Sequence, residues 1–202
     1  SELKMFDIGD FINVTGTIFK TQTEEITLIV KEFNILSKSI LPLPEKWHGI
    51  QDEDLKVRYR YLDTIMDTEV LKRFKKRSEI IRHFKDFLIN NDYLEVETPI
   101  LQPLYGGASA RPFKTHHNAL DMPLYLRIAD ELYLKRLIIG GFDKVFEVGK
   151  SFRNEGIDRF HNPEFTICEL YEAYTDYFGM MDIAEKIIIY IAEKIGLCDA
   201  II

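Results

Sequence analysis

The sequence predicts an α+β fold, in which an antiparallel sheet is flanked by helices and follows a separate β-hairpin. Three observations support this prediction. Residues 9–33 alternate polar and apolar side chains, which is typical of strands. Residues 69–89 and 181–195 carry apolar side chains every three or four positions, which is typical of helices that bury one face. Residues 145–174 predict two more strands joined by a charged loop.

The hairpin at residues 9–33 is too small to enclose a core, because an isolated two-stranded hairpin is marginally stable in water. It therefore predicts the last strands of a small β-domain over residues 1–40. Prolines then interrupt the pattern, and residues 41–68 are expected to form a linker. A second, larger domain is expected over residues 69–202.

The helix at residues 69–89 is expected to be followed by a strand from Tyr93 to Thr98, which stops at Pro99 because proline cannot donate a ladder hydrogen bond. The polar face of this helix is basic. It is interpreted either as a solvated face or as a surface that contacts RNA, and its cations are Lys72, Arg73, Lys75, Lys76 and Arg77.

Between this strand and the charged hairpin, the sequence predicts a strand at residues 124–128 and a helix at residues 131–139 that two glycines terminate. Gly106 and Gly107 precede them and form a turn, which is either an ordinary loop or a place where the backbone approaches a ligand closely. Gly196 is expected to end the last helix.

The charged hairpin is the most informative segment. Because strand side chains alternate between faces, antiparallel pairing can gather five of them over one surface: Arg153, Glu155, Phe165, Glu169 and Tyr171. A buried sheet face would normally carry apolar residues, since buried charges need partners. The residues are interpreted either as a mutually paired surface network or as a site where an arginine holds an anion, a ring stacks on a planar group and carboxylates receive an ammonium.

The composition of the chain argues against several classes of protein. No apolar run approaches the roughly 20 residues that cross a bilayer, and the first residues have no export pattern, so we expect a cytoplasmic protein with no membrane association. Cys168 and Cys198 lack metal-ligand spacing and are expected to be reduced thiols. The net charge of −7 argues against sequence-blind nucleic-acid binding but allows a local basic face.

The residues that carry a resemblance are Phe152-Arg153-Asn154-Glu155, His161-Asn162-Pro163-Glu164-Phe165 and Glu169-Leu170-Tyr171. Together they resemble motif 2 of class II aminoacyl-tRNA synthetases, in the version that bacterial lysyl-tRNA synthetases carry. The helix, strand and Pro99 resemble motif 1, the dimerisation element. Residues 106–118 and 124–136 also look like lysyl enzymes rather than aspartyl or asparaginyl relatives, so the resemblance extends from residue 9 to residue 195.

The resemblance implies an ATP site. Arg153 would be the catalytic residue, which bridges the α-phosphate of ATP and the carboxylate of lysine and stabilises charge at phosphorus. Phe165 would stack on the adenine, which Glu155 and Asn162 would also contact. His161 would reach the outer phosphates from the motif 2 loop.

The same resemblance implies an L-lysine site. Glu131 and Glu169, with the backbone of Gly107, would receive the α-ammonium group. Arg153 would bind the carboxylate, and Tyr171 would help to hold the ε-ammonium group. The lysine carboxylate itself attacks, so no side chain acts as a covalent nucleophile.

The expected partners are L-lysine, tRNA(Lys) and a second copy of the chain, bound through motif 1 with Pro99 at the interface. Residues 9–33 resemble the end of the OB-fold anticodon-binding domain of the family. The Mg²⁺ ligands and the glycine-rich motif 3 of the family do not occur before Ile202. We therefore expect no metal ligands in this chain, an internal piece of a larger synthetase, and little or no adenylate formation by the isolated chain.

Two other functions remain open at the level of sequence. The chain could be a non-catalytic dimerisation or binding module derived from a synthetase. It could also belong to a synthetase-like paralogue that lysylates a protein, although such paralogues usually lack the anticodon domain that residues 9–33 resemble.

Overall fold

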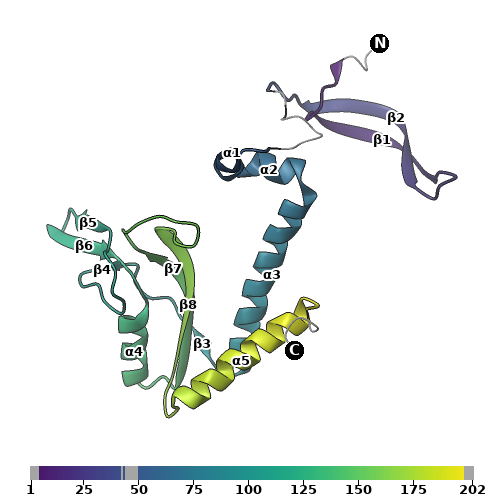
Figure 1. Ribbon diagram of the computed structural model, residues 1–202. Helices are drawn as coiled ribbons and strands as arrows, with labels where there is room; N and C mark the ends of the chain where they lie inside the picture. Colours follow the sequence, from purple (N-terminus) through teal and green to yellow (C-terminus); the bar gives the residue numbers. More distant parts are fainter. Residues whose placement is uncertain (1–4, 42, 44–49, 198–202) are drawn as a thin grey trace. The chain divides into compact units, whose positions relative to one another are not determined.

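The computed structural model describes residues 5–41, 43 and 50–197 (Figure 1). Its contacts divide the chain into two compact units, Ser1–Lys75 and Lys76–Ile202. Residues 42 and 44–49 of the predicted linker, and Cys198, lie outside the described residues. In the part of the chain that is described, no helix has the length and apolar content that a membrane span requires.

The first unit contains the predicted hairpin, formed by β1 (Phe11–Lys20) and β2 (Ile26–Ser37) in antiparallel register. The ends of the hairpin are joined by Lys38, whose Nζ lies 2.6 Å from a carboxylate oxygen of Asp7 and 2.8 Å from one of Asp10. Many apolar side chains of the two strands are exposed, among them Phe11, Ile18 and Ile26.

Two short helices, α1 (Glu53–Arg58) and α2 (Arg60–Met66), occupy the segment for which sequence predicts only a linker. The first is capped by Asp52, whose carboxylate accepts hydrogen bonds from the backbone N–H groups of Asp54 and Leu55 at 2.8 and 3.2 Å. Periodicity did not reveal these helices because each is only about two turns long.

Helix α3 (Thr68–Asn90) confirms the predicted helix and continues from the first unit into the second. The second unit has two three-stranded sheets. One has the order β3-β7-β8, formed by β3 (Leu94–Glu95), β7 (Lys144–Phe152) and β8 (Glu164–Glu172). The other has the order β4-β6-β5, formed by β4 (Leu101–Gln102), β6 (Met122–Leu126) and β5 (Lys114–His117).

The pairing corrects the expected strand and sheet. Strand β3 runs parallel to β7, whereas β7 and β8 are antiparallel, so the sheet is mixed. The strand expected over residues 93–98 shortens to Leu94–Glu95, because Thr98 turns its backbone N–H and hydroxyl toward the carboxylate of Glu147 at 3.1 and 2.6 Å instead of continuing the ladder.

Helix α4 (Glu131–Ile139) has the predicted bounds. Helix α5 (Tyr177–Lys194) begins earlier than expected, because Asp176 caps it by accepting hydrogen bonds from Phe178 and Gly179 at 3.0 and 3.1 Å. In Figure 1, α4 lies on one side of the β7–β8 pair and α5 lies on the other side, with the end of α3.

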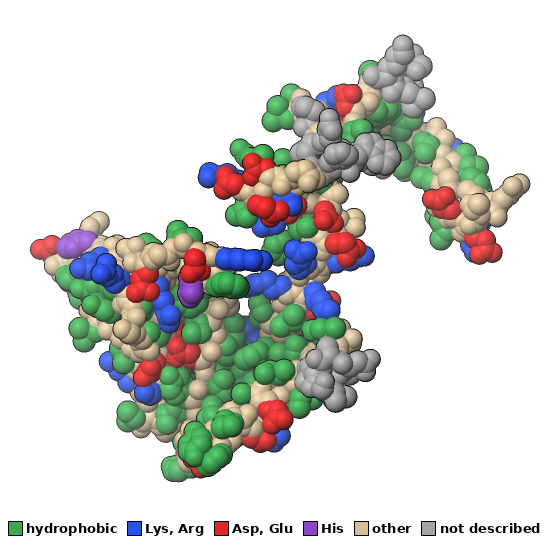
Figure 2. Space-filling model, in the orientation of Figure 1, with side chains coloured by type: hydrophobic (Ala, Val, Ile, Leu, Met, Phe, Trp, Pro, Cys, Tyr) green, Lys and Arg blue, Asp and Glu red, His purple; other side chains and the backbone are tan. Residues whose placement is uncertain are grey.

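The core uses the even-numbered side chains of β7 and β8, while the odd-numbered ones face the other way. Phe146 is fully buried against Leu88, Phe87 and Ile187, which come from α3 and α5. Hydrophobic side chains gather over α5 and the neighbouring part of the sheet (Figure 2). The core therefore anchors one face of the sheet and leaves the opposite face for polar residues.

Candidate functional site

The odd-numbered face of the β7–β8 pair carries three of the predicted site residues, Phe165, Glu169 and Tyr171. The register places Glu147 opposite Glu169 and Ser151 opposite Phe165. Directly opposed residues share a face in an antiparallel pair, so these side chains project together. The predicted alternation is confirmed for Phe165, Glu169 and Tyr171, but the strand that was expected to carry both Arg153 and Glu155 ends at Phe152.

Arg153 stays close to the sheet although it lies beyond the end of β7. Its backbone N–H donates to the carbonyl of Pro163 at 2.9 Å, which continues the pairing by one step. Its guanidinium carbon lies 5.1 Å from the centroid of the Phe165 ring, a cation–π distance. Its Nε is buried without a hydrogen-bond partner among the described residues, so this cation retains an unused donor.

Glu155 is not on the strand face, which corrects the expectation that it shares a ladder position with Arg153. The chain leaves the sheet there because the N–H of Asn154 donates to the carbonyl of Arg111 at 2.7 Å. The N–H of Arg111 in turn donates to Glu155 Oε1 at 3.3 Å. Residue 111 is therefore a neighbour of the site that sequence reasoning did not assign.

The loop between β7 and β8 carries His161 and Asn162, both exposed. His161 Nδ1 lies 2.7 and 2.8 Å from the two carboxylate oxygens of Asp158. Hydrogen bonds from the backbone of Phe160 and from His161 hold the pKa of Asp158 below its usual range. This pair organises the loop from within, and it leaves the loop residues facing solvent.

Glu169 and Tyr171 form the second predicted group. The Tyr171 hydroxyl donates to Glu169 Oε2 at 3.1 Å, and the backbone N–H of Asp130 donates to Oε1 at 3.3 Å. Burial and the carboxylates of Glu169, Glu131 and Asp130 raise the pKa of Tyr171, so its proton stays on oxygen. The side chain of Glu169 is thus fixed by two donors.

Gly107 and Glu131 are brought together by backbone conformation. Gly107 has φ +86°, and a Cβ there would lie 2.8 Å from Cβ of Glu131 and 3.1 Å from Cβ of Ala129. Only glycine allows this approach without strain. Glu131 Oε1 forms an ion pair with Lys135 Nζ at 2.6 Å. The Glu131 carboxylate therefore already has an exposed cationic partner one turn along α4.

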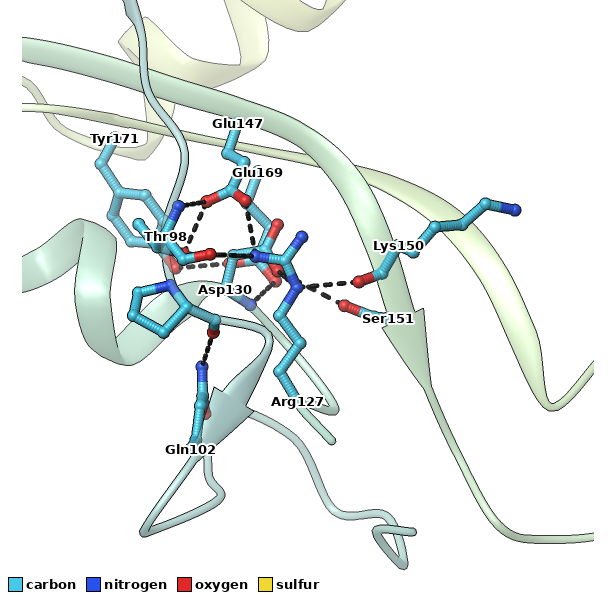
Figure 3. A network of polar contacts seen from close by, with 10 residues as sticks. Thr98, Gln102, Arg127, Asp130, Glu147, Lys150, Ser151, Glu169 and Tyr171 are labelled. Carbon is cyan, nitrogen blue, oxygen red and sulfur yellow. Dashed lines mark hydrogen bonds and ion pairs between the residues drawn. The ribbon is translucent and has the colours of Figure 1, made fainter. Parts of the chain in front are cut away.

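A buried polar network lies behind these residues (Figure 3). Arg127 is 1% exposed, and its Nη1 lies 2.5 Å from Glu147 Oε1 while its Nε lies 3.0 Å from Asp130 Oδ1. Arg127 also donates to the carbonyl of Lys150 at 2.8 Å and to the hydroxyl of Thr98 at 3.2 Å. Its guanidinium therefore joins the segments before β4, after β6 and within β7.

This network passes over Gly149, where a Cβ would lie 2.1 Å from Arg127 Nη2. A side chain at that position would displace the guanidinium. Sequence reasoning missed Arg127 and Glu147. Each of these residues is a single charge between two apolar neighbours, in Leu126-Arg127-Ile128 and in Phe146-Glu147-Val148. A lone charge in a buried strand needs a partner of opposite charge, so the two could have been expected to pair.

In the part of the chain that the structure describes, no group of three or more histidine, cysteine, aspartate or glutamate side chains is placed to hold a metal ion. Cys168 is a free thiol packed on the core side of β8, and burial raises its pKa to about 12. It is therefore a poor nucleophile and metal ligand at neutral pH.

Comparison with known families decides the assignment. The family model described as tRNA synthetases class II (D, K and N) matches residues 52–201. The chain belongs to this family. The predicted resemblance is therefore confirmed, and the match begins at the Asp52 cap of α1, before the domain start that was expected at residue 69.

The synthetase chain is also similar to curated proteins named lysine–tRNA ligase. It is 63% identical over 195 residues to that of Clostridium novyi (strain NT), an alignment that covers 96% of this chain and 38% of the relative. It is 60% identical over 194 residues to that of Clostridium tetani (strain Massachusetts / E88), covering 96% of this chain and 39% of the relative. The synthetase chain thus spans less than two fifths of the length of these relatives.

Proposed function

We propose that the chain forms the part of a lysine–tRNA ligase that binds L-lysine and the adenosine α-phosphate portion of ATP. The ligase joins lysine to AMP and then transfers the lysyl group to tRNA(Lys). The observation that carries this proposal is the state of Arg153. Its guanidinium lies over the Phe165 ring, and its Nε is buried without a hydrogen-bond partner among the described residues. A cation held in this way is suited to an anionic ligand.

Arg153 has a specific task in this reaction. The α-phosphate of ATP and the lysine carboxylate repel each other, and a guanidinium can donate to both at once. A carboxylate oxygen of lysine forms the bond to the α-phosphorus as the bond to pyrophosphate breaks. Negative charge increases around phosphorus during this step, and a donor already in place stabilises it without reorganisation.

The adenine is proposed to lie on Phe165, on the ring face that Arg153 leaves open, with Glu155 and Asn162 at its edge. His161 is proposed to contact the outer phosphates from the exposed loop. Support comes from the position of the loop, which begins at Arg153 and returns to the sheet at Glu164. Stacking of a base on an aromatic side chain contributes roughly 1–3 kcal/mol.

The α-ammonium group of lysine is proposed to lie among Glu169, Glu131 and the backbone of Gly107, with Tyr171 directed to the ε-ammonium group. Free L-lysine carries two ammonium groups, and three carboxylates, those of Glu169, Glu131 and Asp130, act on the neighbouring Tyr171 hydroxyl. The fixed orientation of Glu169, held by Tyr171 and Asp130, supports this arrangement. The family uses Mg²⁺ with ATP, and this ion would share the charge of the phosphates with Arg153.

The remaining partners are also proposals. Helix α3 with Pro99 is proposed to mediate a homodimer, and Pro99 is exposed as this requires. Strands β1 and β2 are proposed to belong to the OB-fold domain that reads the tRNA anticodon, which agrees with their exposed apolar side chains. The protein is proposed to act in the cytoplasm, where aminoacylation takes place.

The test uses a hybrid ligase, in which the matched residues of the Clostridium novyi relative are replaced by those of this chain. The expected result is ATP–pyrophosphate exchange that depends on L-lysine and is not supported by ornithine or norleucine at the same concentration. Absence of lysine-dependent exchange in a folded hybrid would contradict the proposal.

The folded hybrid also separates the two remaining functions. Lysine binding by calorimetry without any exchange, together with a dimer in sedimentation, would favour a non-catalytic binding or dimerisation module. Lysylation of a protein but not of tRNA(Lys) by the hybrid would favour the paralogue.

A further inference from the structure

We propose that Asp130 is a positioning residue of the lysine site, a third acid that does not contact the substrate, fixes Glu169 and supplies negative charge behind the ammonium group. This inference rests on the proposed function. Asp130 is 0% exposed and immediately precedes Glu131, the proposed lysine ligand at the start of α4. Its backbone N–H donates to Glu169 Oε1 at 3.3 Å. One residue therefore links the two proposed carboxylate ligands.

The side chain of Asp130 does not serve its own helix. It is the N-cap of α4 but makes no side-chain cap hydrogen bond. Its Oδ1 instead lies 3.0 Å from Arg127 Nε and accepts a hydrogen bond from Ser151 at 3.4 Å. Aspartate at an N-cap usually accepts hydrogen bonds from the first turn, so this orientation gives up capping in favour of the network.

The other carboxylate oxygen of Asp130, Oδ2, gives the strongest indication of a nearby cationic ligand. Asp130 Oδ2 is buried and has no hydrogen-bond partner among the described residues. A buried, unsatisfied carboxylate oxygen is costly in free energy and needs an explanation. A cationic ligand on Glu169 and Glu131 provides one, because it would offset the charge of Asp130 through space.

The charges around Asp130 do not balance without such a ligand. Only one cation of the network, Arg127, contacts it, whereas Glu147 on β7, Glu169 on β8 and Glu131 on α4 add negative charge. The negative charge of Asp130 also acts on β8, where it contributes to the raised pKa of both Cys168 and Tyr171. Burial, opposed by Arg127 and assisted by Glu147 and Glu169, raises the pKa of Asp130 to about 6.

The raised pKa of Asp130 predicts how chain stability and lysine binding change with pH. The pKa of Asp130 in the folded chain is above its ordinary value of 3.8, so its contribution to stability is present below that value and is lost as the pH rises through about 6. A bound cation favours the ionised form. Lysine should therefore bind more weakly below pH 6, where Asp130 is neutral, and more tightly above it.

The test substitutes Asp130→Asn in the hybrid ligase, which removes the charge and retains an oxygen for Arg127 and Ser151. We expect the KM for lysine at pH 7.5 to rise roughly tenfold, while the KM for ATP changes less than about twofold. The increase in KM below pH 6 should disappear, since asparagine cannot titrate. The melting temperature should stay the same or rise, because the ionised carboxylate no longer has to be buried.

The matched control is Asp143→Asn, an exposed acid beyond the far end of α4. It should keep both the KM for lysine and its pH profile. A second variant, Asp130→Ala, removes the anchor to Arg127 as well and should raise the KM for lysine further than Asp130→Asn does.

Two results would overturn the inference. One is an unchanged KM for lysine with an unchanged pH profile in Asp130→Asn. The other is a parallel rise in the KM for lysine and for ATP with a lower melting temperature, which would indicate general structural damage. If instead the unsubstituted hybrid shows no lysine-dependent exchange, the proposed function itself fails, and the inference fails with it.

Discussion

The guanidinium carbon of Arg153 lies 5.1 Å from the centre of the Phe165 ring, where the β7–β8 hairpin opens into its charged loop. The contact fixes the orientation of the cation without using its donors, since a ring face offers no hydrogen-bond acceptor of the carboxylate kind. A salt bridge would have fixed the arginine equally well but would have occupied those donors. The orientation of the guanidinium is therefore set by the ring, while its Nε stays without a hydrogen-bond partner among the described residues.

Replacement of Arg153 tests its role in the chemical step. In the hybrid ligase, Arg153→Ala should lower kcat for lysine-dependent exchange about 100-fold or more, because a donor that stabilises transition-state charge is lost. Calorimetry should show a much smaller loss of lysine affinity. Arg153→Lys retains the charge but not the two-donor geometry and should recover only part of the rate. Equal losses in rate and in lysine affinity would show that Arg153 only binds.

Replacement of Phe165 tests the adenine platform. Phe165→Leu should raise the KM for ATP roughly tenfold, since stacking on a base contributes about 1–3 kcal/mol, and should leave lysine affinity within about twofold. Phe165→Tyr keeps the ring and is the control. An unchanged KM for ATP in Phe165→Leu would place the adenine elsewhere.

Gly141 is a suitable control position for a substitution of Gly107. Both have positive φ, +86° and +100°, but a Cβ at residue 107 meets Glu131, whereas at residue 141 it meets nothing within 4 Å. Gly141→Ala should cost about 1 kcal/mol of unfolding free energy because of its backbone conformation alone, and Gly107→Ala should cost more because its Cβ would also collide with Glu131. Only Gly107→Ala should also weaken lysine binding, as measured by calorimetry. If both variants bind lysine equally well, Gly107 does not shape the site.

The buried ion pairs of Arg127 predict a large loss of stability. Arg127→Met leaves Glu147 and Asp130 buried without their cation, which should lower the unfolding free energy by about 3–5 kcal/mol in urea titrations of the chain. Arg136→Met removes an exposed arginine that lies over the Tyr133 ring and should change it by less than about 1 kcal/mol. Similar losses from the two variants would mean that the network contributes little.

Glu172 predicts a pH-dependent contribution. Its Oε2 accepts a hydrogen bond from the Tyr93 hydroxyl at 2.5 Å, and its Oε1 forms an ion pair with Lys144 Nζ at 3.1 Å. Burial alone would raise its pKa, but these two partners lower it below the ordinary value of 4.5. The stabilisation is therefore present above pH 4.5 and is lost as the pH falls through the lower folded value.

Urea unfolding of Glu172→Gln measures this contribution. The variant should be about 1–2 kcal/mol less stable than the unsubstituted chain at pH 7, and the difference should shrink toward pH 3. Glu164→Gln, which removes the more exposed ion pair with Lys150, is the control and should show little loss at either pH. A difference that is constant with pH would show that the Glu172 charge is not involved.

Local pattern was sufficient for the elements that are long or capped by strong signals. Helix α4 and the alternation of Phe165, Glu169 and Tyr171 follow from periodicity, because side-chain direction repeats with a fixed step in helices and strands. Pattern was insufficient for Leu94–Glu95, where a hydrogen bond to Glu147, distant in sequence, ends the strand.

The sequence by itself determined the family and the identity of the residues that line the β7–β8 face, because residue type and spacing within one hairpin are local information. Only the tertiary structure decided how those residues are held. Arg127 meets Thr98 and Glu147, which lie 29 and 20 residues away in the sequence, and Gly107 meets Glu131 only because its positive φ allows it. Contacts of this kind depend on the packing of segments far apart in sequence, and no spacing along the chain specifies them.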